Sequence, residues 1–311
     1  STYTDRNTNP RPTGLKKETR FMLNHEINRA FKQRILKGGP VLMPGAANAL
    51  AARVIEDQGF EAIYLSGAGL TNTYLGMPDM GFVGLNEIAQ HTSTIRDATE
   101  LPIVVDADNG FGNALNVRHT IRTLERAGAS AVQLEDQKTP KRCGHFSGKE
   151  VVPLDEARSR IRAAVDARQD ENTLIVARTD ARATDGYDEA LERAAAFIED
   201  GADITFVEAP QSKEEMRGIP AALKGTPQLV NLVVGGKTPI LDLDELGDMG
   251  FSLVLYANVA LQSAVYGMQM ALGQLRETGR MDEGGPVASF VERQRMVRKD
   301  LFDELEKRYA I

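Results

Sequence analysis

Short apolar runs recur along the chain, and a segment with helical spacing of apolar residues follows each of them. The runs are rich in Val, Ile and Leu and do not alternate with polar residues, which is typical of parallel strands that are buried on both faces. Eight runs of this kind predict strands at residues 41–44, 62–66, 102–106, 131–135, 174–178, 204–208, 229–232 and 253–256.

Apolar residues at spacings of three and four positions predict a helix after each strand. The helices between strands are expected at residues 48–58, 85–98, 114–127, 154–167, 187–199, 213–223 and 241–249, and the longest, at 259–277, follows the last strand. Gly59, Gly128 and Gly201 each stand at the end of a predicted helix, where glycine readily takes the left-handed conformation that closes it. Two further helices are predicted outside this repeat, at residues 19–37 and 287–308.

This series of strand–helix units predicts a (β/α)₈ TIM barrel, an α/β fold, and a doubly wound open sheet is the alternative. The N-terminal helix and the C-terminal helices are expected to be additions that cap the barrel or mediate assembly. Because no repeat or change of composition divides the chain, residues 19–311 are expected to form a single catalytic domain. Residues 1–18, which are rich in Asn, Thr and Pro, are expected to form a flexible arm.

Charge and composition exclude several classes of function. The formal net charge is −7 and no run of five or more Lys and Arg occurs, which argues against a nucleic-acid partner. The one cysteine cannot form a disulfide within the chain, so a reducing compartment, the cytoplasm, is expected. No apolar stretch approaches the roughly 18 residues of a membrane span, so no membrane partner is expected.

Polar side chains gather directly after the predicted strands. In a (β/α)₈ barrel, the C-terminal ends of the strands form the face on which active sites are built. One polar residue at a strand end could cap the following helix, but capping alone does not easily explain a succession of them. The sequence therefore predicts a site on this face, which includes the strand-end residues Ser66, Asp106, Glu135, Arg178, Glu208 and Asn231.

Four carboxylates are expected to converge there. Asp106 and Asp108 are two positions apart, so both project to one side at the end of the third strand. Asp79 and Glu135 come from neighbouring strand ends. A hard divalent cation would relieve their mutual repulsion, and Mg²⁺, which prefers octahedral oxygen coordination, is the predicted ion, with Mn²⁺ as a substitute. Ion pairs with nearby basic side chains are the alternative explanation.

The loop after the fourth strand carries the sequence Lys-Arg-Cys-Gly-His at residues 141–145. A cationic setting increases the thiolate fraction of a cysteine, so Cys143 is predicted to act as an acid/base. His145 could serve the same role, while a nucleophilic thiol or a small buried hydrophobe are competing interpretations of Cys143. Zinc is not expected, because Cys143 and His145 lack a second ligand pair at the spacing of a zinc site.

Arg178 is the candidate for anion recognition, because a guanidinium can hold a carboxylate through two parallel hydrogen bonds. A salt bridge to Glu208 is the alternative role. Further donors follow the second and seventh strands, at Ser66, Gly67 and Ala68 and at Asn231, Gly236 and Thr238. A divalent metal with Arg178 could hold the carboxylate and 2-oxygen of an α-keto acid and stabilise an enolate, while an acid protonates the departing fragment. This describes a retro-aldol or retro-Claisen lyase.

Several motifs resemble those of the isocitrate lyase/phosphoenolpyruvate mutase superfamily, from about residue 29 to the C-terminus. The matching segments are YLSGAG at 64–69, LGMPD at 75–79, VDADNGFG at 105–112, LEDQ at 134–137, KRCGH at 141–145, ARTD at 177–180, and Asn231 with GGKTP at 235–239. The KRCGH loop is similar to that of the lyase branch, in which the cysteine acts as acid/base.

The resemblance implies Mg²⁺ held mostly through water by Asp79, Asp106, Asp108 and Glu135. It implies the catalytic residues Tyr64, Lys141, Cys143, His145, Arg178 and Glu208. The implied substrate-binding residues are Ser66, Gly67, Ala68, Gly144, Asn231, Gly236, Thr238 and Pro239. It also implies a homotetramer in which a terminal helix, expected within residues 261–308, is swapped between subunits.

Two departures bear on the substrate. Where methylisocitrate lyases usually carry Glu-Phe-Gly, and dimethylmalate lyases, petal-death protein and oxaloacetate hydrolases Glu-Gly-Gly, this chain has Val-Gly-Gly at residues 234–236. Ala257 and Asn258 replace the common Pro after Tyr256. We expect a 2-hydroxy di- or tricarboxylate, cleaved to pyruvate or another α-keto acid and a smaller acid. The glycine pair favours the 2,3-dimethylmalate type over the 2-methylisocitrate type.

Three alternatives stay open on the same scaffold. An oxaloacetate decarboxylase or hydrolase would use the same metal and Arg178. A carboxyphosphonoenolpyruvate-type phosphonomutase would move a P–C bond instead. A non-enzymatic binder of small acids would keep the fold without turnover.

Overall fold

Eight parallel strands form one sheet, in the order β1-β8-β7-β6-β5-β4-β3-β2. The computed structural model describes residues 22–142 and 148–310. The strands are β1 (Val41–Pro44), β2 (Ile63–Leu65), β3 (Ile103–Asp106), β4 (Ala131–Glu135), β5 (Leu174–Thr179), β6 (Ile204–Val207), β7 (Gln228–Asn231) and β8 (Phe251–Tyr256). Each predicted strand is confirmed, with ends that differ by up to two residues.

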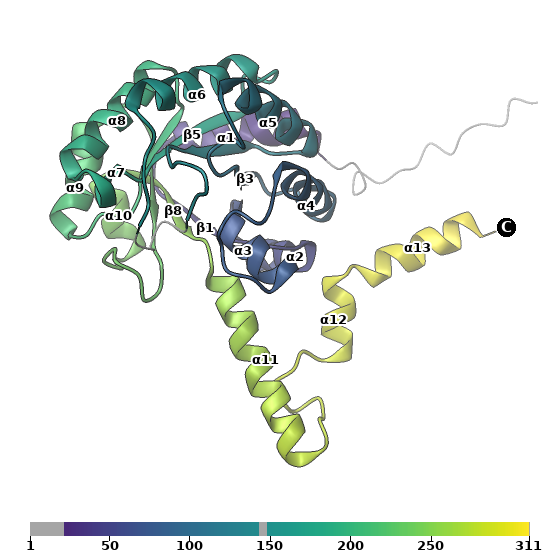
Figure 1. Ribbon diagram of the computed structural model, residues 1–311. Helices are drawn as coiled ribbons and strands as arrows, with labels where there is room; N and C mark the ends of the chain where they lie inside the picture. Colours follow the sequence, from purple (N-terminus) through teal and green to yellow (C-terminus); the bar gives the residue numbers. More distant parts are fainter. Residues whose placement is uncertain (1–21, 143–147, 311) are drawn as a thin grey trace, which may run out of the picture.

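The sheet closes on itself between β1 and β2. Gly45 forms a parallel bridge with Tyr64, and the N–H of Ala46 donates to the carbonyl oxygen of Tyr64 at 2.8 Å. Because β1 also pairs with β8, neighbouring strands follow one another around a ring. The (β/α)₈ barrel is therefore confirmed, and the doubly wound open sheet is excluded (Figure 1).

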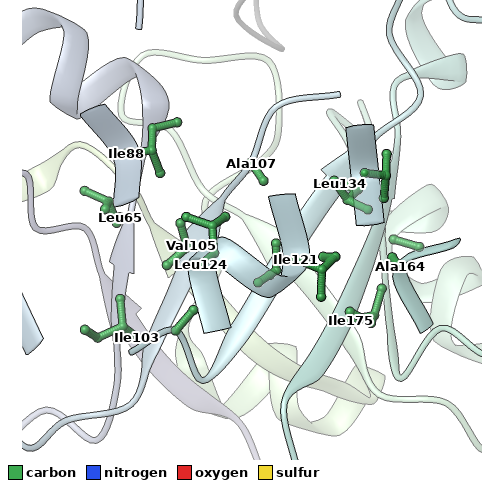
Figure 2. Close-up of a cluster of buried hydrophobic side chains, with 14 of the residues drawn as sticks. Leu65, Ile88, Ile103, Val105, Ala107, Ile121, Leu124, Leu134, Ala164 and Ile175 are labelled. Atoms are coloured by element: carbon green, nitrogen blue, oxygen red, sulfur yellow. The ribbon is translucent and has the colours of Figure 1, made fainter. Parts of the chain in front are cut away.

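The strands are buried on both faces, as their continuous apolar runs predict. Val104 points into the barrel, where it joins a cluster with side chains from the other strands. Its neighbours Ile103 and Val105 point outward into a second cluster, beneath the helices. Figure 2 shows this outer layer, in which Ile121 and Leu124 of one helix lie against the strands. Two apolar layers thus hold each strand in position from both sides.

The helices predicted between the strands are present with small shifts at their ends. They are α2 (Ala49–Asp57), α4 (Leu85–Ala98), α5 (Ala114–Ala127), α6 (Leu154–Ala167), α8 (Tyr187–Glu199), α9 (Lys213–Ala222) and α10 (Leu243–Met249). Gly59, Gly128 and Gly201 have φ values of 82°, 105° and 97°, so the left-handed conformation expected of them is confirmed. Three short elements were not predicted because they are too brief for a periodic pattern: α3 (Gly67–Leu70), the π-helix η2 (Thr71–Leu75) and α7 (Ala181–Thr184).

The two outer helices differ from the prediction. Helix α1 spans Asn24–Leu36 and begins after Leu23, whose backbone is extended; residues 19–21 lie outside the described part of the chain. The single helix predicted at residues 287–308 is wrong, because two helices, α12 (Phe290–Met296) and α13 (Lys299–Tyr309), replace it. Arg298 has a left-handed backbone with φ 54°, which ends the helical hydrogen-bond ladder. Its guanidinium lies 3.3 Å from Glu56 of α2, which fixes the turn there.

Helix α11 (Val259–Thr278) leaves the barrel after β8 and extends away from it (Figure 1). None of its side chains is buried, although many are apolar. Tyr266, Met268, Met270 and Leu272 are all at least half exposed. No helix among the described residues has both the length and the apolar character to cross a lipid bilayer.

The close contact between Gly45 and β8 yields a test of barrel closure. A Cβ on Gly45 would lie 1.8 Å from the carbonyl oxygen of Ala257, and backbone cannot move aside as a flexible side chain can. We expect Gly45→Ala to lower the free energy of unfolding by about 2–3 kcal/mol, because overpacking in a filled core is costly. Gly284→Ala is the matched control, since that Cβ would meet nothing within 4 Å. Urea unfolding of both variants measures this, and equal stabilities would contradict the assigned contact.

Candidate active site

A cavity of about 340 Å³ lies at the C-terminal ends of the strands. It is lined by residues from β2 through β8, so nearly the whole barrel contributes to it. Many of the predicted site residues line it: Tyr64, Ser66, Ala68, Asp79, Asp106, Glu135, Lys141, Arg178, Glu208 and Asn231. The barrel therefore brings together side chains that lie far apart in the sequence.

The remaining predicted residues have different positions. Gly67 and Asp108 adjoin the cavity through contacts with Asp106 and Lys141. The loop after β7 carries exposed Gly236, buried Thr238 and half-buried Pro239, none of which is a lining residue of this cavity. Cys143, Gly144 and His145 lie outside the described residues.

The carboxylates of the site surround one ammonium group. The Lys141 Nζ lies 2.7 Å from Asp79 Oδ1 and 2.7 Å from Asp108 Oδ1, and all three side chains are buried. Burial, with further repulsion from Asp106 and Asp79, raises the pKa of Asp108 to about 7 despite the opposing effect of Lys141. Burial likewise raises the pKa of Glu135 well above its usual value. The cluster therefore carries more negative charge than its buried setting favours, and it attracts cations.

The residues present suit a hard divalent cation that is held largely through water. Among residues 22–142 and 148–310, no three acidic, Cys or His side chains are close enough to hold a metal directly. The cradle is nevertheless rich in oxygen: Gly67 borders it, and a Cβ there would lie 3.1 Å from Asp108 Oδ1 and 3.4 Å from Asp106 Oδ2. Glu135 Oε1 is buried without a hydrogen-bond partner in the described part of the chain. Carboxylate oxygens are the donors that Mg²⁺ prefers, and Mg²⁺ needs only one or two of them directly when it keeps several waters.

Arg178 is held by three carboxylates and one ring. Its Nε and Nη2 donate to the two carboxylate oxygens of Asp180 at 2.9 and 3.0 Å. Glu135 lies 3.4 Å and Glu208 3.3 Å from the guanidinium, so the predicted pairing with Glu208 is present alongside two others. The guanidinium also lies over the ring of Phe206, 5.1 Å from its centroid. These contacts fix its direction at the edge of the cavity.

A second layer of ionic contacts supports Arg178 from behind. Burial alone would raise the pKa of Asp180, but Arg178 and Lys149, the latter at 2.9 Å, lower it to about 2. Asp136 in turn accepts hydrogen bonds from the Asp180 backbone N–H at 2.9 Å and from Arg193 of α8 at 3.2 Å. Lys149, Arg193 and Phe206 carry no functional signal in the sequence, whereas Asp136 and Asp180 belong to the strand-end segments LEDQ and ARTD.

Tyr64 is buried at the end of β2, beside Asp106. Burial and the nearby carboxylates raise the pKa of its phenol well above 10. The phenol therefore keeps its proton and can act as a hydrogen-bond donor toward a negatively charged oxygen in the cavity.

The wall formed by β7 and β8 has a different character. In the ring of strands it lies across from β3 and β4, which carry the carboxylates. Its lining residues Asn231, Val233, Leu255, Ala257 and Asn258 carry no formal charge. The cavity thus has an ionic end, which contains the carboxylates, Lys141 and Arg178, and a neutral end at β7 and β8.

Comparisons with known proteins agree with this geometry. The family model of phosphoenolpyruvate phosphomutase matches residues 31–276. The chain is 43% identical to 2,3-dimethylmalate lyase of Eubacterium barkeri, over 78% of this chain and 84% of that protein. It is 43% identical to 2-methylisocitrate lyase of Aeropyrum pernix, over 83% of this chain and 84% of that protein. A crystal structure of 2,3-dimethylmalate lyase superposes with a TM-score of 0.87 at 32% identity, covering 93% of this chain and 96% of the other.

The support of Arg178 by Asp180 can be tested by the binding of oxalate and Mg²⁺, which are present together in a solved structure of phosphonopyruvate hydrolase that is 27% identical to this chain. We expect Asp180→Asn to weaken the Mg²⁺-dependent binding of oxalate by about 10- to 100-fold, since hydrogen bonds to charged groups contribute roughly 1.5–3 kcal/mol. Asp185→Asn makes the same chemical change on an exposed residue nearby and should leave binding unchanged. Calorimetric titration of both variants provides the measurement. Unchanged affinity in Asp180→Asn would show that Arg178 does not need this partner.

Proposed function

Because the chain belongs to the phosphoenolpyruvate mutase/isocitrate lyase superfamily, we propose that it is a metal-dependent carbon–carbon lyase acting on a 2-hydroxy dicarboxylate of the 2,3-dimethylmalate type. The products are pyruvate and a smaller carboxylic acid. One observation carries the proposal: an oxygen-rich cradle and a fixed guanidinium, Arg178, line the same cavity. A carboxylate with an adjacent 2-oxygen is the chemical group that suits both.

A solved structure of phosphonopyruvate hydrolase, 27% identical to this chain, is a complex with oxalate and Mg²⁺, and we propose Mg²⁺ for this chain. Asp79, Asp106, Asp108 and Glu135 would hold the ion, mostly through water. When bound, the ion supplies positive charge that stabilises a negatively charged 2-oxygen. Lys141 stays charged, because the surrounding carboxylates raise its pKa far above its usual value in spite of burial.

The residues of the chain then have separate tasks. Arg178 binds the substrate carboxylate, and the Tyr64 phenol donates a hydrogen bond to the 2-oxygen. The 2-hydroxyl loses its proton to a carboxylate of the site, the C2–C3 bond breaks, and the C2–O bond becomes the carbonyl of pyruvate. The electron pair passes to C3 of the other fragment, which takes a proton there. We propose Cys143, on the evidence of its sequence motif alone, as the donor of that proton, with Lys141 and His145 beside it in the motif.

A panel of four candidate substrates tests the reaction class: 2,3-dimethylmalate, 2-methylisocitrate, oxaloacetate and phosphonopyruvate. We expect release of pyruvate from 2,3-dimethylmalate with Mg²⁺, detected as NADH consumption by lactate dehydrogenase, and none with EDTA. Cys143→Ser should lower kcat by about 10²- to 10⁴-fold, the contribution of a general acid, while oxalate binding is kept. Asp185→Asn is the control variant, with unchanged turnover.

Other outcomes of the panel select other reactions. Turnover of 2-methylisocitrate alone would change the substrate but keep the lyase. Turnover of oxaloacetate or phosphonopyruvate, without cleavage of any hydroxy acid, would overturn the proposed reaction in favour of a hydrolase, decarboxylase or phosphonomutase. Turnover that is insensitive to EDTA would overturn the metal.

We also propose that the protein is a cytoplasmic homotetramer that exchanges its C-terminal helices between subunits. The apolar side chains of α11 support this, because this helix of 20 residues buries no side chain against the part of the chain that the structure describes. Contiguous apolar surface of this kind is typical of an interface. Arg295 of α12 and Arg298, just after it, form ion pairs with Asp57 and Glu56 of α2 within the same chain, which supports a docking surface for this segment on a barrel.

Size-exclusion chromatography with light scattering tests the assembly. We expect a mass four times that of the 34.0 kDa chain. Leu272→Glu should shift the protein to smaller species, because it places a charge on the apolar side of α11. Gln269→Glu adds the same charge at an exposed polar position of α11 and should leave the mass unchanged. A wild-type monomer at micromolar concentration would overturn the proposal.

A further inference from the structure

We propose that Gln137 is a positioning residue for the reaction: its side chain fixes the backbone on both sides of Arg142, and this sets the place of the neighbouring Lys141 in the cavity. The inference rests on the proposed function, because it assigns a task within the same active site. Gln137 ends the segment LEDQ, whose two carboxylates, Glu135 and Asp136, belong to the site and to the ionic network behind it.

The side-chain amide of Gln137 pairs with both backbone groups of one residue. Its Oε1 accepts a hydrogen bond from the N–H of Arg142 at 3.0 Å, and its Nε2 donates to the carbonyl oxygen of Arg142 at 2.8 Å. A glutamine amide has an acceptor end and a donor end, and both are used here. The N–H belongs to the peptide bond from Lys141, and the carbonyl belongs to the peptide bond toward Cys143. The backbone is therefore held on both sides of Arg142.

Gln137 is itself held in place, and it is only 1% exposed. Its backbone forms an antiparallel bridge with Val151. Next to this bridge, the N–H of Lys138 donates to the carbonyl oxygen of Glu150 at 2.9 Å. The amide therefore reaches Arg142 from a fixed point.

A second amide, that of Asn109, ties this arrangement to the loop that carries the acidic cluster. Its Nδ2 donates to Thr139 Oγ1 at 2.8 Å and to the carbonyl oxygen of Gln137 at 3.4 Å. Asn109 directly follows Asp108 in the sequence and is 5% exposed. Asp108 and Lys141, which are ion-paired in the site, thus lie on two chain segments that the two amides also hold together.

Lys141 is the group of the site that most needs a fixed backbone. Its Nζ lies 2.7 Å from Asp79 Oδ1 and 2.7 Å from Asp108 Oδ1, in a buried setting. A lysine ammonium is carried on a flexible four-carbon stem, so its place depends on where the stem begins as well as on its partners. The neutral amide of Gln137 fixes that beginning without adding a charge near the carboxylates.

The same substitution at two buried glutamines tests this role. Gln228 is also 1% exposed, and its amide also pairs at both ends, with Thr205 and Thr226, but it lies at the start of β7, away from the site. We expect Gln137→Met to lower kcat for 2,3-dimethylmalate by about 10- to 100-fold and to leave KM within about 3-fold, because a catalytic group displaced by about 1 Å loses this much rate. Gln228→Met should reduce stability to urea as Gln137→Met does but keep kcat within about 2-fold of wild type, because it loses buried hydrogen bonds only.

Amide hydrogen exchange tests the contact without turnover. The N–H of Arg142 should exchange at least about 10-fold faster in Gln137→Met than in wild type, because its acceptor is lost. In Gln228→Met its exchange should match that of wild type. If Gln137→Met does not fold, Gln137→Asn carries the same tests, since its amide is one methylene too short to hold both groups.

The outcomes separate this inference from the lyase proposal. Equal losses of kcat in the Gln137 and Gln228 variants, a loss confined to KM, or unchanged exchange at Arg142 would each overturn the positioning role. If wild type turns over only oxaloacetate or phosphonopyruvate, the lyase is removed, and the comparison of kcat on that substrate still decides the role of Gln137. Cleavage of 2,3-dimethylmalate with equal kcat in wild type and Gln137→Met would keep the lyase and remove the positioning role.

Discussion

The site depends on negative charge that is buried at one end of the barrel. Asp79, Asp106, Asp108 and Glu135 have little contact with water, and burial penalises each ionised carboxylate. Two cations offset part of this negative charge: Lys141 lies among the carboxylates, and Arg178 lies beside them. The arrangement of the surrounding residues follows from this requirement, because each buried cation in turn needs hydrogen-bond partners that hold it in one direction.

The need of each buried charge for a partner explains why a network of charged residues extends from the cavity to a helix outside the barrel. Arg178 is held by Asp180, Asp180 by Lys149 and the Asp136 network, and Asp136 by Arg193 from a helix outside the barrel. A network in which the members are paired is stable in a low dielectric, whereas an unpaired member is costly. The outer helices therefore influence the direction of a guanidinium that they do not touch.

The sequence predicts the scaffold well because each strand repeats the same physical demand. A run such as Ile103–Asp106 is apolar within the barrel wall and ends in a polar residue at the face of the barrel, so the sequence predicts both the strand and the site face. The charged network behind Arg178 could not be predicted, since Arg193 lies in a predicted helix whose pattern gives no sign of its pairing with Asp136. The break at Arg298 depends on a contact with Glu56 far away in the sequence. The loop that carries Cys143 stays a prediction from its motif.

The seam at which the barrel closes also orients helix α11. Gly45 leaves no room for a side chain, so the backbone at the end of β8 is constrained by a distant strand. Just beyond that contact, the carbonyl oxygen of Asn258 accepts a hydrogen bond from the N–H of Gln262 at 2.8 Å, which starts the hydrogen-bond ladder of α11. Closure of the barrel and the direction in which α11 leaves it therefore cannot vary independently.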